Sequence, residues 1–233
     1  MVGKLLQLVA DSVVRGKIDA RSPYPPELVG QDGADELTRR ALETGISPAD
    51  VLNLGLVAGM KTVGDRFRDG EIFLPEVLMA ARALTAGLAH LQPLLRSGAV
   101  KARGTIVIGT VAGDLHDIGK RIVSLFFEGG GWNVVDLGVD VPAERFIAAI
   151  EKHQPFAVGL STLLTTTMAS MGHVAREVKS RHPKVKLVVG GAPITQDFAD
   201  RIGADFYSPD PQGALDYLEA ESLKVQTSKG PGV

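Results

Sequence analysis

Hydrophobic residues repeat with two different periods along this chain, and the change of period falls near residue 100. Before it, apolar residues recur every three or four positions, as on one face of a helix. After it, short runs rich in β-branched residues alternate with helical segments. We therefore expect an α/β protein with a helical domain over residues 1–100, an α/β domain over 101–226 and a disordered tail over 227–233.

The N-terminal half predicts four helices, and so a four-helix bundle. Apolar residues from Leu52 to Phe67 are spaced four, four, three and four positions apart, which places them on one face. Ser47 precedes this helix as an N-cap, with Pro48 at the first helical position. A similar series runs over residues 77–95 and is expected to kink or end near Pro93. The two earlier helices are expected around residues 2–18 and 28–44.

The C-terminal half predicts a parallel sheet with helices on both faces. Its length and the number of strands favour a five-stranded, flavodoxin-like order. Residues 97–103 make a plausible linker between the two halves. The strands are expected near residues 105–111, 133–136, 156–161, 185–189 and 205–207. The helices between them are expected to begin near Ile118, Ala143, Met168, Thr195 and Gln212.

Composition narrows the class of protein. The 25 basic and 27 acidic residues nearly balance, so the chain lacks the excess of positive charge that is typical of nucleic-acid-binding proteins. The chain has no cysteine, which excludes disulfides, thiolate catalysis and Cys-ligated metals. No apolar run approaches the roughly 18 residues of a membrane helix, and no leader pattern opens the chain. We expect a cytoplasmic protein with neither nucleic acid nor membrane as a partner.

Polar loops follow three of the expected strands. Residues 113–119 follow the first strand, 161–167 the third, and Gly190-Gly191 the fourth. Ligands of open parallel sheets bind beyond the carboxyl ends of the strands, so we expect these loops to form one site. His116 lies on a glycine-bounded loop where an imidazole can coordinate a metal, and Asp114 is close enough to hold the other ring nitrogen.

The motifs in these loops resemble those of a known family. The pattern Asp114-x-His116-x-x-Gly119 is similar to the signature of the vitamin B12 (cobalamin)-binding domain of methionine synthase and of methyltransferase corrinoid proteins. The similarity extends from about residue 45 to about residue 215. Other matching segments are Val135–Pro142, Ser161-x-Leu163 and Gly190-Gly191 in the sheet half, and Gly59-Met60, Val63-Gly64-Asp65 and Phe73-Leu74-Pro75 in the helical half, which look like the cap over the corrin ring.

The resemblance implies a site for cobalamin bound base-off, with its nucleotide tail inserted between the sheet and a flanking helix. His116 would be the lower cobalt ligand, Asp114 would hydrogen-bond to it, and Thr167 would complete a relay where methionine synthase has a serine. The other implied cofactor contacts are Gly113, Leu115, Asp117, Ile118, Gly119, Ser161, Leu163, Thr165, Gly190 and Gly191. On the cap side they are Asn53, Met60, Val63, Phe67 and Leu74.

The same resemblance implies a methyl carrier of a cobalamin-dependent methyltransferase system. Its cofactor would alternate between Co(I) corrinoid and methylcobalamin. The implied partners are a substrate-specific methyltransferase, expected to be a TIM-barrel chain, an acceptor methyltransferase and a corrinoid reductive activase. The sequence leaves the methyl donor open among methanol, methylamines, glycine betaine and methoxyaromatics. Two other functions that use related domains are a cobalamin-dependent sensor or regulator and an adenosylcobalamin mutase subunit.

Simpler roles are available for several of these residues. Asp114 and Asp117 precede an apolar run and could cap the following helix. Met60, Val63 and Phe67 have the spacing of an ordinary helix face and could belong to the core of the bundle.

Overall fold

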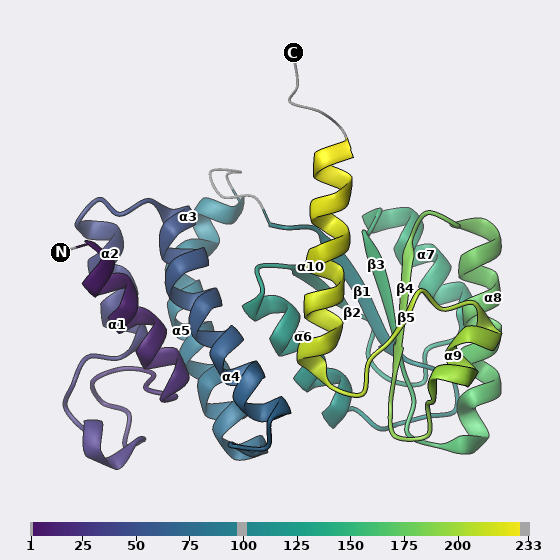
Figure 1. The fold of residues 1–233 in the computed structure, drawn as a ribbon, viewed down its shortest axis with the longest axis horizontal. Helices are drawn as coiled ribbons and strands as arrows, with labels where there is room; N and C mark the ends of the chain where they lie inside the picture. Colours follow the sequence, from purple (N-terminus) through teal and green to yellow (C-terminus); the bar gives the residue numbers. More distant parts are fainter. Residues whose placement is uncertain (1, 97–101, 229–233) are drawn as a thin grey trace. The chain divides into compact units, whose positions relative to one another are not determined.

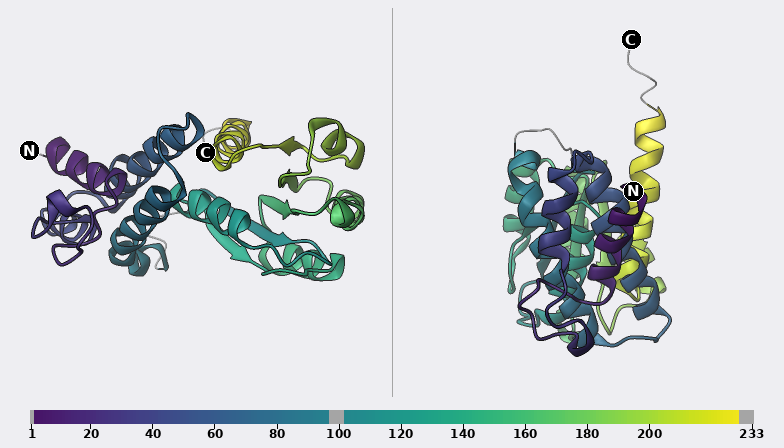
Figure 2. Two further views of the ribbon diagram at one scale, coloured as in Figure 1. Left: turned by 90° about the horizontal axis from the view of Figure 1, so that it is seen from below. Right: turned by 90° about the vertical axis from the view of Figure 1, so that its left-hand side faces the viewer.

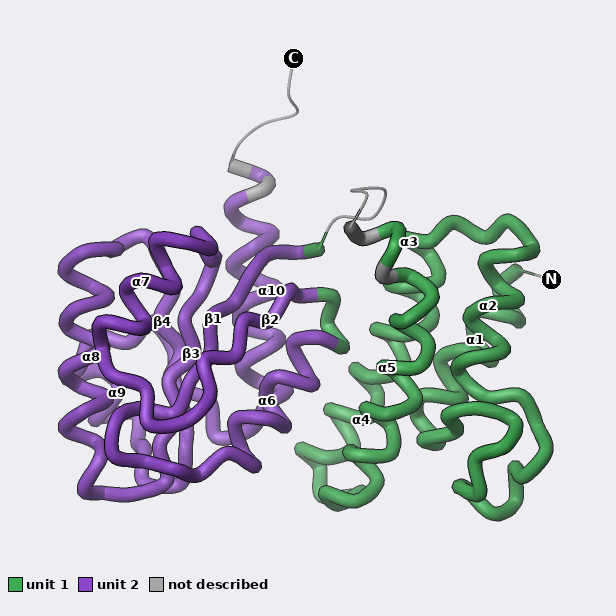
Figure 3. The backbone as a smooth tube through the Cα atoms, turned by 180° about the vertical axis from the view of Figure 1, so that it is seen from behind, with its two compact units in different colours: residues 1–102, 129–131 green, residues 103–128, 132–233 purple. Residues whose placement is uncertain are grey.

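The computed structural model describes residues 2–96 and 102–228 (Figure 1). The chain divides into two compact units (Figure 3). The helical unit comprises residues 1–102 and 129–131, and the sheet unit comprises residues 103–128 and 132–233. The expected linker falls largely on residues 97–101, which lie outside the described residues. None of the helices in the described part of the chain combines the length and apolarity that crossing a bilayer requires.

The helical unit contains the four helical regions that the sequence predicts. The third is continuous from Pro48 to Arg68, with a π-helical stretch between two α-helical stretches. Ser47 caps it by accepting a hydrogen bond from the backbone N–H of Asp50, at 3.0 Å. The elements are α1 (Val2–Val14), η1 (Pro26–Leu28), α2 (Ala34–Glu43), α3 (Pro48–Asp50), η2 (Val51–Val57), α4 (Ala58–Arg68) and α5 (Leu74–Arg96).

Two helix boundaries differ from the sequence prediction, and at Pro93 one of the two predicted outcomes, a kink or an end, is excluded. Helix α1 ends at Val14 because Gly16 adopts a left-handed conformation (φ +66°) and turns the chain. Helix α2 begins only at Ala34, where the carboxylate of Glu36 accepts the N–H of Gly33 at 2.9 Å and fixes the first turn. Helix α5 continues past Pro93 to Arg96 instead of ending there.

The core of the helical unit forms where α1 packs against η2 and α4. Glycines on the third helical region allow this close approach. A Cβ at Gly55 would lie 2.9 Å from Val9, and one at Gly59 would lie 2.6 Å from the carbonyl oxygen of Ala10. Met60 and Val63 follow on the same helix and are almost completely buried.

The sheet unit is a five-stranded parallel sheet in the order β2-β1-β3-β4-β5, which confirms the predicted flavodoxin-like order. The strands begin and end within one residue of the expected positions. They are β1 (Thr105–Thr110), β2 (Asn133–Asp136), β3 (Ala157–Ser161), β4 (Lys186–Gly190) and β5 (Phe206–Tyr207).

Helices cover both faces of this sheet (Figure 2). Buried residues of α7, α8 and α9 pack on one face, against Val107, Val158 and Leu187. Those of α6 and α10 pack on the other, against Ile106 and Val188. The elements are α6 (Ile118–Gly129), α7 (Ala143–His153), η3 (Thr165–Thr167), α8 (Met168–Arg181), α9 (Gln196–Ile202) and α10 (Pro211–Ser228).

The C-terminal helix is longer than the sequence predicts. Thr227, expected in a disordered tail, is still helical, and its hydroxyl donates to the carbonyl of Leu223 at 3.1 Å. The remainder of the expected tail, residues 229–233, lies outside the described residues.

Candidate functional site

The strand order brings three polar loops to one edge of the sheet. Strands β1, β3 and β4 are direct neighbours, and Thr110, Ser161 and Gly190 lie side by side in register at their carboxyl ends. The segments that follow these residues therefore begin at one place, as the sequence predicts.

The loop after β1 is held in shape by hydrogen bonds between its backbone and two side chains. Gly113 has a positive φ of +85°, and its N–H donates to the carboxylate of Asp140 at 2.7 Å. The hydroxyl of Thr110 donates to the carbonyl of His116 at 2.9 Å. These bonds fix both ends of the segment that carries Asp114 and His116.

His116 and Asp114 form the centre of the site. The Nδ1 atom of His116 lies 2.7 Å from Oδ1 of Asp114, and the same oxygen accepts the backbone N–H of His116 at 3.0 Å. The Asp114 side chain is fully buried, whereas that of His116 is 51% exposed. Because an ionised carboxylate only accepts hydrogen bonds, the neutral form of the ring carries its proton on Nδ1 and keeps a free lone pair on Nε2.

Asp114 remains ionised despite its burial. Burial alone would raise its pKa, but hydrogen bonds from the backbone N–H groups of Leu163 and His116, from the His116 ring and from the Thr162 hydroxyl hold the pKa far below its usual range. The donors from the loop after β3 all reach Oδ2: the N–H of Leu163 at 2.6 Å, the hydroxyl of Thr162 at 2.8 Å and that of Thr167 at 3.3 Å.

Thr162 is a site residue that the sequence reasoning missed. It occupies the variable position of the Ser161-x-Leu163 motif, so the motif did not single it out. The available signal was the run of hydroxyl residues from Ser161 to Thr167. The backbone of Thr162 approaches Gly191 so closely that a Cβ at Gly191 would lie 1.7 Å from the carbonyl oxygen of Thr162. The second glycine of Gly190-Gly191 is therefore a packing requirement of the site.

Large apolar side chains are exposed beside the histidine. Leu115 is 72% exposed and Ile118 is 69% exposed, and Leu163 and Leu164 are exposed to a smaller extent. A Cβ at Gly119 would meet nothing within 4 Å. A half-exposed imidazole with open apolar surface on two neighbouring loops suits a large, flat ligand that carries a metal.

Among the described residues, His116 is not part of a cluster of metal-ligating side chains. No group of three or more His, Cys, Asp or Glu side chains in residues 2–96 and 102–228 could hold a metal ion. A metal bound here needs its other ligands from the molecule that brings it. The donor set thus fits the cobalt of a corrinoid, in which the macrocycle supplies the equatorial ligands.

Asp117 has partners of its own at the start of α6. Its carboxylate pairs with Arg121 and lies 2.8 Å from Nζ of Lys120, and these contacts lower its pKa, with Lys120 as the main cause. Nζ of Lys120, a buried lysine to which the sequence analysis assigns no role, also lies 2.5 Å from the carboxylate of Asp136. The contacts of Lys120 with Asp117 and Asp136 tie the first turn of α6 to the end of β2.

The remaining predicted residues have mixed positions. Ser161 and Gly190 are half-buried at the strand ends, and Thr165 is exposed in η3. The five cap residues all belong to the helical unit. There Met60 and Val63 are buried, Phe67 and Leu74 are partly exposed, and Asn53 is exposed with its side-chain amide donating to the carbonyl of Ala49 at 2.9 Å.

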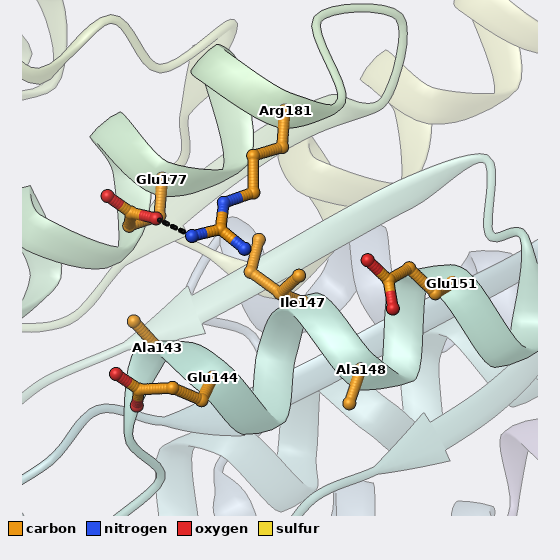
Figure 4. Close-up of a pocket in the computed structure, with 7 residues that line it drawn as sticks. All are labelled: Ala143, Glu144, Ile147, Ala148, Glu151, Glu177 and Arg181. Carbon is orange, nitrogen blue, oxygen red and sulfur yellow. Dashed lines mark ion pairs between the residues drawn. The ribbon is translucent and has the colours of Figure 1, made fainter.

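A separate cavity of about 170 Å³ lies between α7 and α8 (Figure 4). Its only ion pair among the residues drawn joins Glu177 and Arg181, at 3.0 Å. None of the predicted site residues lines it. The lining residues are Ala143, Glu144, Ile147, Ala148, Glu151, Glu177 and Arg181.

Comparison with known families and proteins gives a consistent result. Two family models, both described as a B12 binding domain, match residues 30–92 and 104–215. The trimethylamine corrinoid protein of Methanosarcina barkeri is 41% identical over 191 residues, which cover 80% of this chain and 88% of that protein. The dimethylamine corrinoid protein of the same organism is 41% identical over 208 residues, which cover 88% of this chain and 91% of that protein.

Two solved structures resemble the fold over nearly the whole chain. The methanol:cobalamin methyltransferase complex MtaBC from Methanosarcina barkeri contains a chain with a TM-score of 0.77 and 32% identity, covering 94% of this chain and 80% of that one. A cobalamin-binding protein from Desulfitobacterium hafniense DCB-2 gives a TM-score of 0.72 and 27% identity, covering 94% of this chain and 98% of that one.

Proposed function

The chain belongs to the cobalamin-binding corrinoid proteins of methyltransferase systems, and from this premise we propose that it carries a methyl group between two methyltransferases, with His116 as the lower ligand of its cobalt. The observation that carries the proposal is the half-exposed imidazole whose Nδ1 is bound to a buried, ionised Asp114. That arrangement leaves Nε2 unprotonated and directed away from the carboxylate, which is what a metal ligand requires.

The corrinoid supplies the methyl-accepting and methyl-donating chemistry when it is bound. The protein's own residues orient it and limit access to it. In this proposal Asp114 fixes the tautomer of His116, and Thr167 supports Asp114. With His116 as the cobalt ligand, the cofactor's own base would be displaced, and residues of the sheet unit would hold its nucleotide tail.

The glycines and hydroxyls at the strand ends accommodate the rest of the cofactor. Gly119 has open space where a side chain would stand, and Gly190 has only the carbonyl of Ser208 nearby, 3.4 Å from an ideal Cβ. We assign Gly113, Leu115, Asp117 and Ile118 to the lower face. Ser161 and Thr165 are assigned to the ring edge or tail, and Leu163, Gly190 and Gly191 to the channel for the nucleotide tail. Asn53, Met60, Val63, Phe67 and Leu74 are assigned to the cap over the methyl face.

The donor and acceptor enzymes are separate chains in this proposal. Relatives at 41% identity are named for trimethylamine and dimethylamine, so we propose that the first partner is a methyltransferase acting on a methylated amine. The resemblance to a chain of the MtaBC complex supports direct association with such a partner. An acceptor methyltransferase and a reductive activase complete the set.

Electron paramagnetic resonance of the Co(II) form tests the ligand assignment. Purified protein loaded with hydroxocobalamin and labelled with ¹⁵N-histidine should show coupling of cobalt to one protein nitrogen. His116→Ala should abolish this coupling and leave the spectrum of a water- or base-ligated corrinoid. His173→Ala is the matched control, because His173 is exposed on α8 and is not part of the site. Coupling that is absent from the wild type, or that survives His116→Ala, would refute the assignment.

A further inference from the structure

Two threonine hydroxyls, not one, lie beside Oδ2 of Asp114. Oγ1 of Thr162 is 2.8 Å from this oxygen, and Oγ1 of Thr167 is 3.3 Å from it. The two hydroxyl oxygens are 2.5 Å apart. Both threonines are buried, Thr162 almost completely, so water does not compete for these contacts.

The number of hydroxyl protons determines which threonine donates to Asp114. Each hydroxyl has a single proton to donate. Thr167 has a second acceptor in the carbonyl of Leu164, at 3.0 Å, and a third in the oxygen of Thr162. Thr162 has the shorter contact with Asp114, and a buried carboxylate is the strongest acceptor within its reach. Its proton therefore goes to Asp114, and Thr167 donates to Thr162 or to Leu164.

We propose that Thr162 is the positioning residue that orients Asp114, and through it His116, and that Thr167 acts mainly through Thr162. The inference deepens the proposed function and rests on it where His116 is the cobalt ligand. The carboxylate then has two distinct sides. Oδ2 is held by Thr162 and by the N–H of the next residue, Leu163, while Oδ1 is left for the backbone and ring of His116.

The backbone holds Thr162 firmly enough for this role. Its N–H donates to the carbonyl of Gly190 at 3.3 Å, which ties it to the end of β4. Gly191, at φ +129°, lies against the carbonyl of Thr162 in a space that no side chain could share. Strands β3 and β4 thus fix the Thr162 hydroxyl relative to the loop after β1. The hydroxyl orients the Asp114 carboxylate, and the carboxylate orients the imidazole.

Nitrogen NMR of the protein without corrinoid tests the inference directly. The ¹⁵N shifts of the His116 ring, measured at one pH about two units above the usual pKa of histidine, report which nitrogen carries the proton. Thr162→Val removes the hydroxyl while keeping the shape of the side chain. We expect it to move the ring away from a dominant Nδ1–H tautomer. Thr162→Ser should keep the wild-type shifts, and Thr167→Val should cause a smaller change than Thr162→Val.

The loaded protein supplies a second measurement. Loss of a partner one shell outside a metal ligand typically weakens metal affinity about 10- to 100-fold, so Thr162→Val should weaken histidine ligation of cobalt about 10-fold. Thr166→Val is the matched control, because it makes the same chemical change on an exposed residue of the same loop. It should leave both the ring shifts and the cobalt coupling unchanged.

Several results would overturn the inference. These are wild-type shifts in Thr162→Val, a larger change in Thr167→Val than in Thr162→Val, or ring shifts in Thr162→Ser that depart from those of the wild type. The last result decides the matter even if Thr162→Val does not fold. Failure of the proposed function has a different signature, since wild-type protein would then lack cobalt coupling to His116 while the ring shifts of the unloaded variants still followed Thr162.

Discussion

At the carboxyl end of the sheet, Asp114 collects hydrogen bonds from residues 48, 49 and 53 positions further along the chain. Polar side chains on the helical unit bond quite differently. Asn53, Thr62 and Thr85 each donate to a backbone carbonyl four residues earlier in their own helix. Sheet edges bring distant segments together, whereas a helix satisfies its polar side chains locally. The specialised chemistry of this protein accordingly gathers at the strand ends.

The largest expected effect is that of Gly191→Ala in the sheet unit. A methyl group there would collide with the carbonyl of Thr162, in a backbone conformation that non-glycine residues avoid. We expect a loss of more than about 3 kcal/mol in the free energy of unfolding of the sheet unit. Urea titration followed by the fluorescence of Trp132, the single tryptophan of the chain, measures it.

Gly45→Ala in the helical unit is the matched control. Gly45 also has a positive φ, of +83°, but a Cβ there would meet nothing within 4 Å. Its cost should be limited to backbone strain, about 1 kcal/mol, as followed by the helical circular dichroism signal. Equal costs for the two variants would show that close packing at Gly191 is not what the site requires.

Asp114→Asn should have the next largest effect. The amide cannot stabilise the ligating tautomer of His116 as a carboxylate does, so histidine ligation of cobalt should weaken about 10- to 100-fold. Corrinoid uptake itself should persist, because many other contacts support it. Spectroscopic titration of the loaded protein across pH would show the shift between histidine-on and histidine-off forms. Superimposable curves for the variant and the wild type would show that the Asp114 carboxylate does not support ligation by His116.

Acid should weaken the sheet unit through the same carboxylate. The pKa of Asp114 is lowered in the folded protein, so its stabilising contribution is complete above its pKa in the unfolded chain and is lost as pH falls. Between about pH 4 and pH 2 the wild type should lose more unfolding free energy than Asp114→Asn. Urea midpoints from Trp132 fluorescence at several pH values measure the difference, and parallel declines would contradict this account.

The smallest effect is expected for Thr62→Ala in the helical unit. The Thr62 hydroxyl is exposed and donates only to the carbonyl of Ala58, at 3.2 Å. Alanine is the better helix former, so the change in unfolding free energy should stay within about 0.5 kcal/mol, in the stabilising direction if anything. A loss above about 1 kcal/mol, measured by circular dichroism during urea unfolding, would show that this side chain serves more than its own helix.

The two units also differ in how far their sequences predict them. Runs of β-branched residues bounded by turn residues located every strand to within one residue. In the helical unit, spacing identified the helices but not all their limits, because Gly16 and Gly33 set boundaries through conformation and capping. Pro93 did not end α5. Periodicity tells which residues share a face, but not where a backbone turns.

The sequence likewise predicted the contacts of the site that are local or part of a family motif, but not those that depend on the backbone fold. The adjacency of His116 and Asp114 follows from two residues of separation, and family motifs pointed to Thr167. Thr162 could not be deduced, because its contact with Asp114 depends on the register of β3 against both β1 and β4. The burial of Met60 and Val63 equally fits a core role, which spacing alone does not separate from a cofactor role.

The strand order has a consequence for the order of events during synthesis. β1 lies between β2 and β3, and Thr162 follows Asp114 by 48 residues. During synthesis His116 therefore leaves the ribosome well before Thr162 and Leu163, which donate hydrogen bonds to the Asp114 carboxylate. Only after Gly191 has left the ribosome can Thr162 settle against β4 and align the imidazole. A nascent chain halted before that point contains His116 and Asp114 but lacks the Thr162 and Leu163 donors that orient the carboxylate.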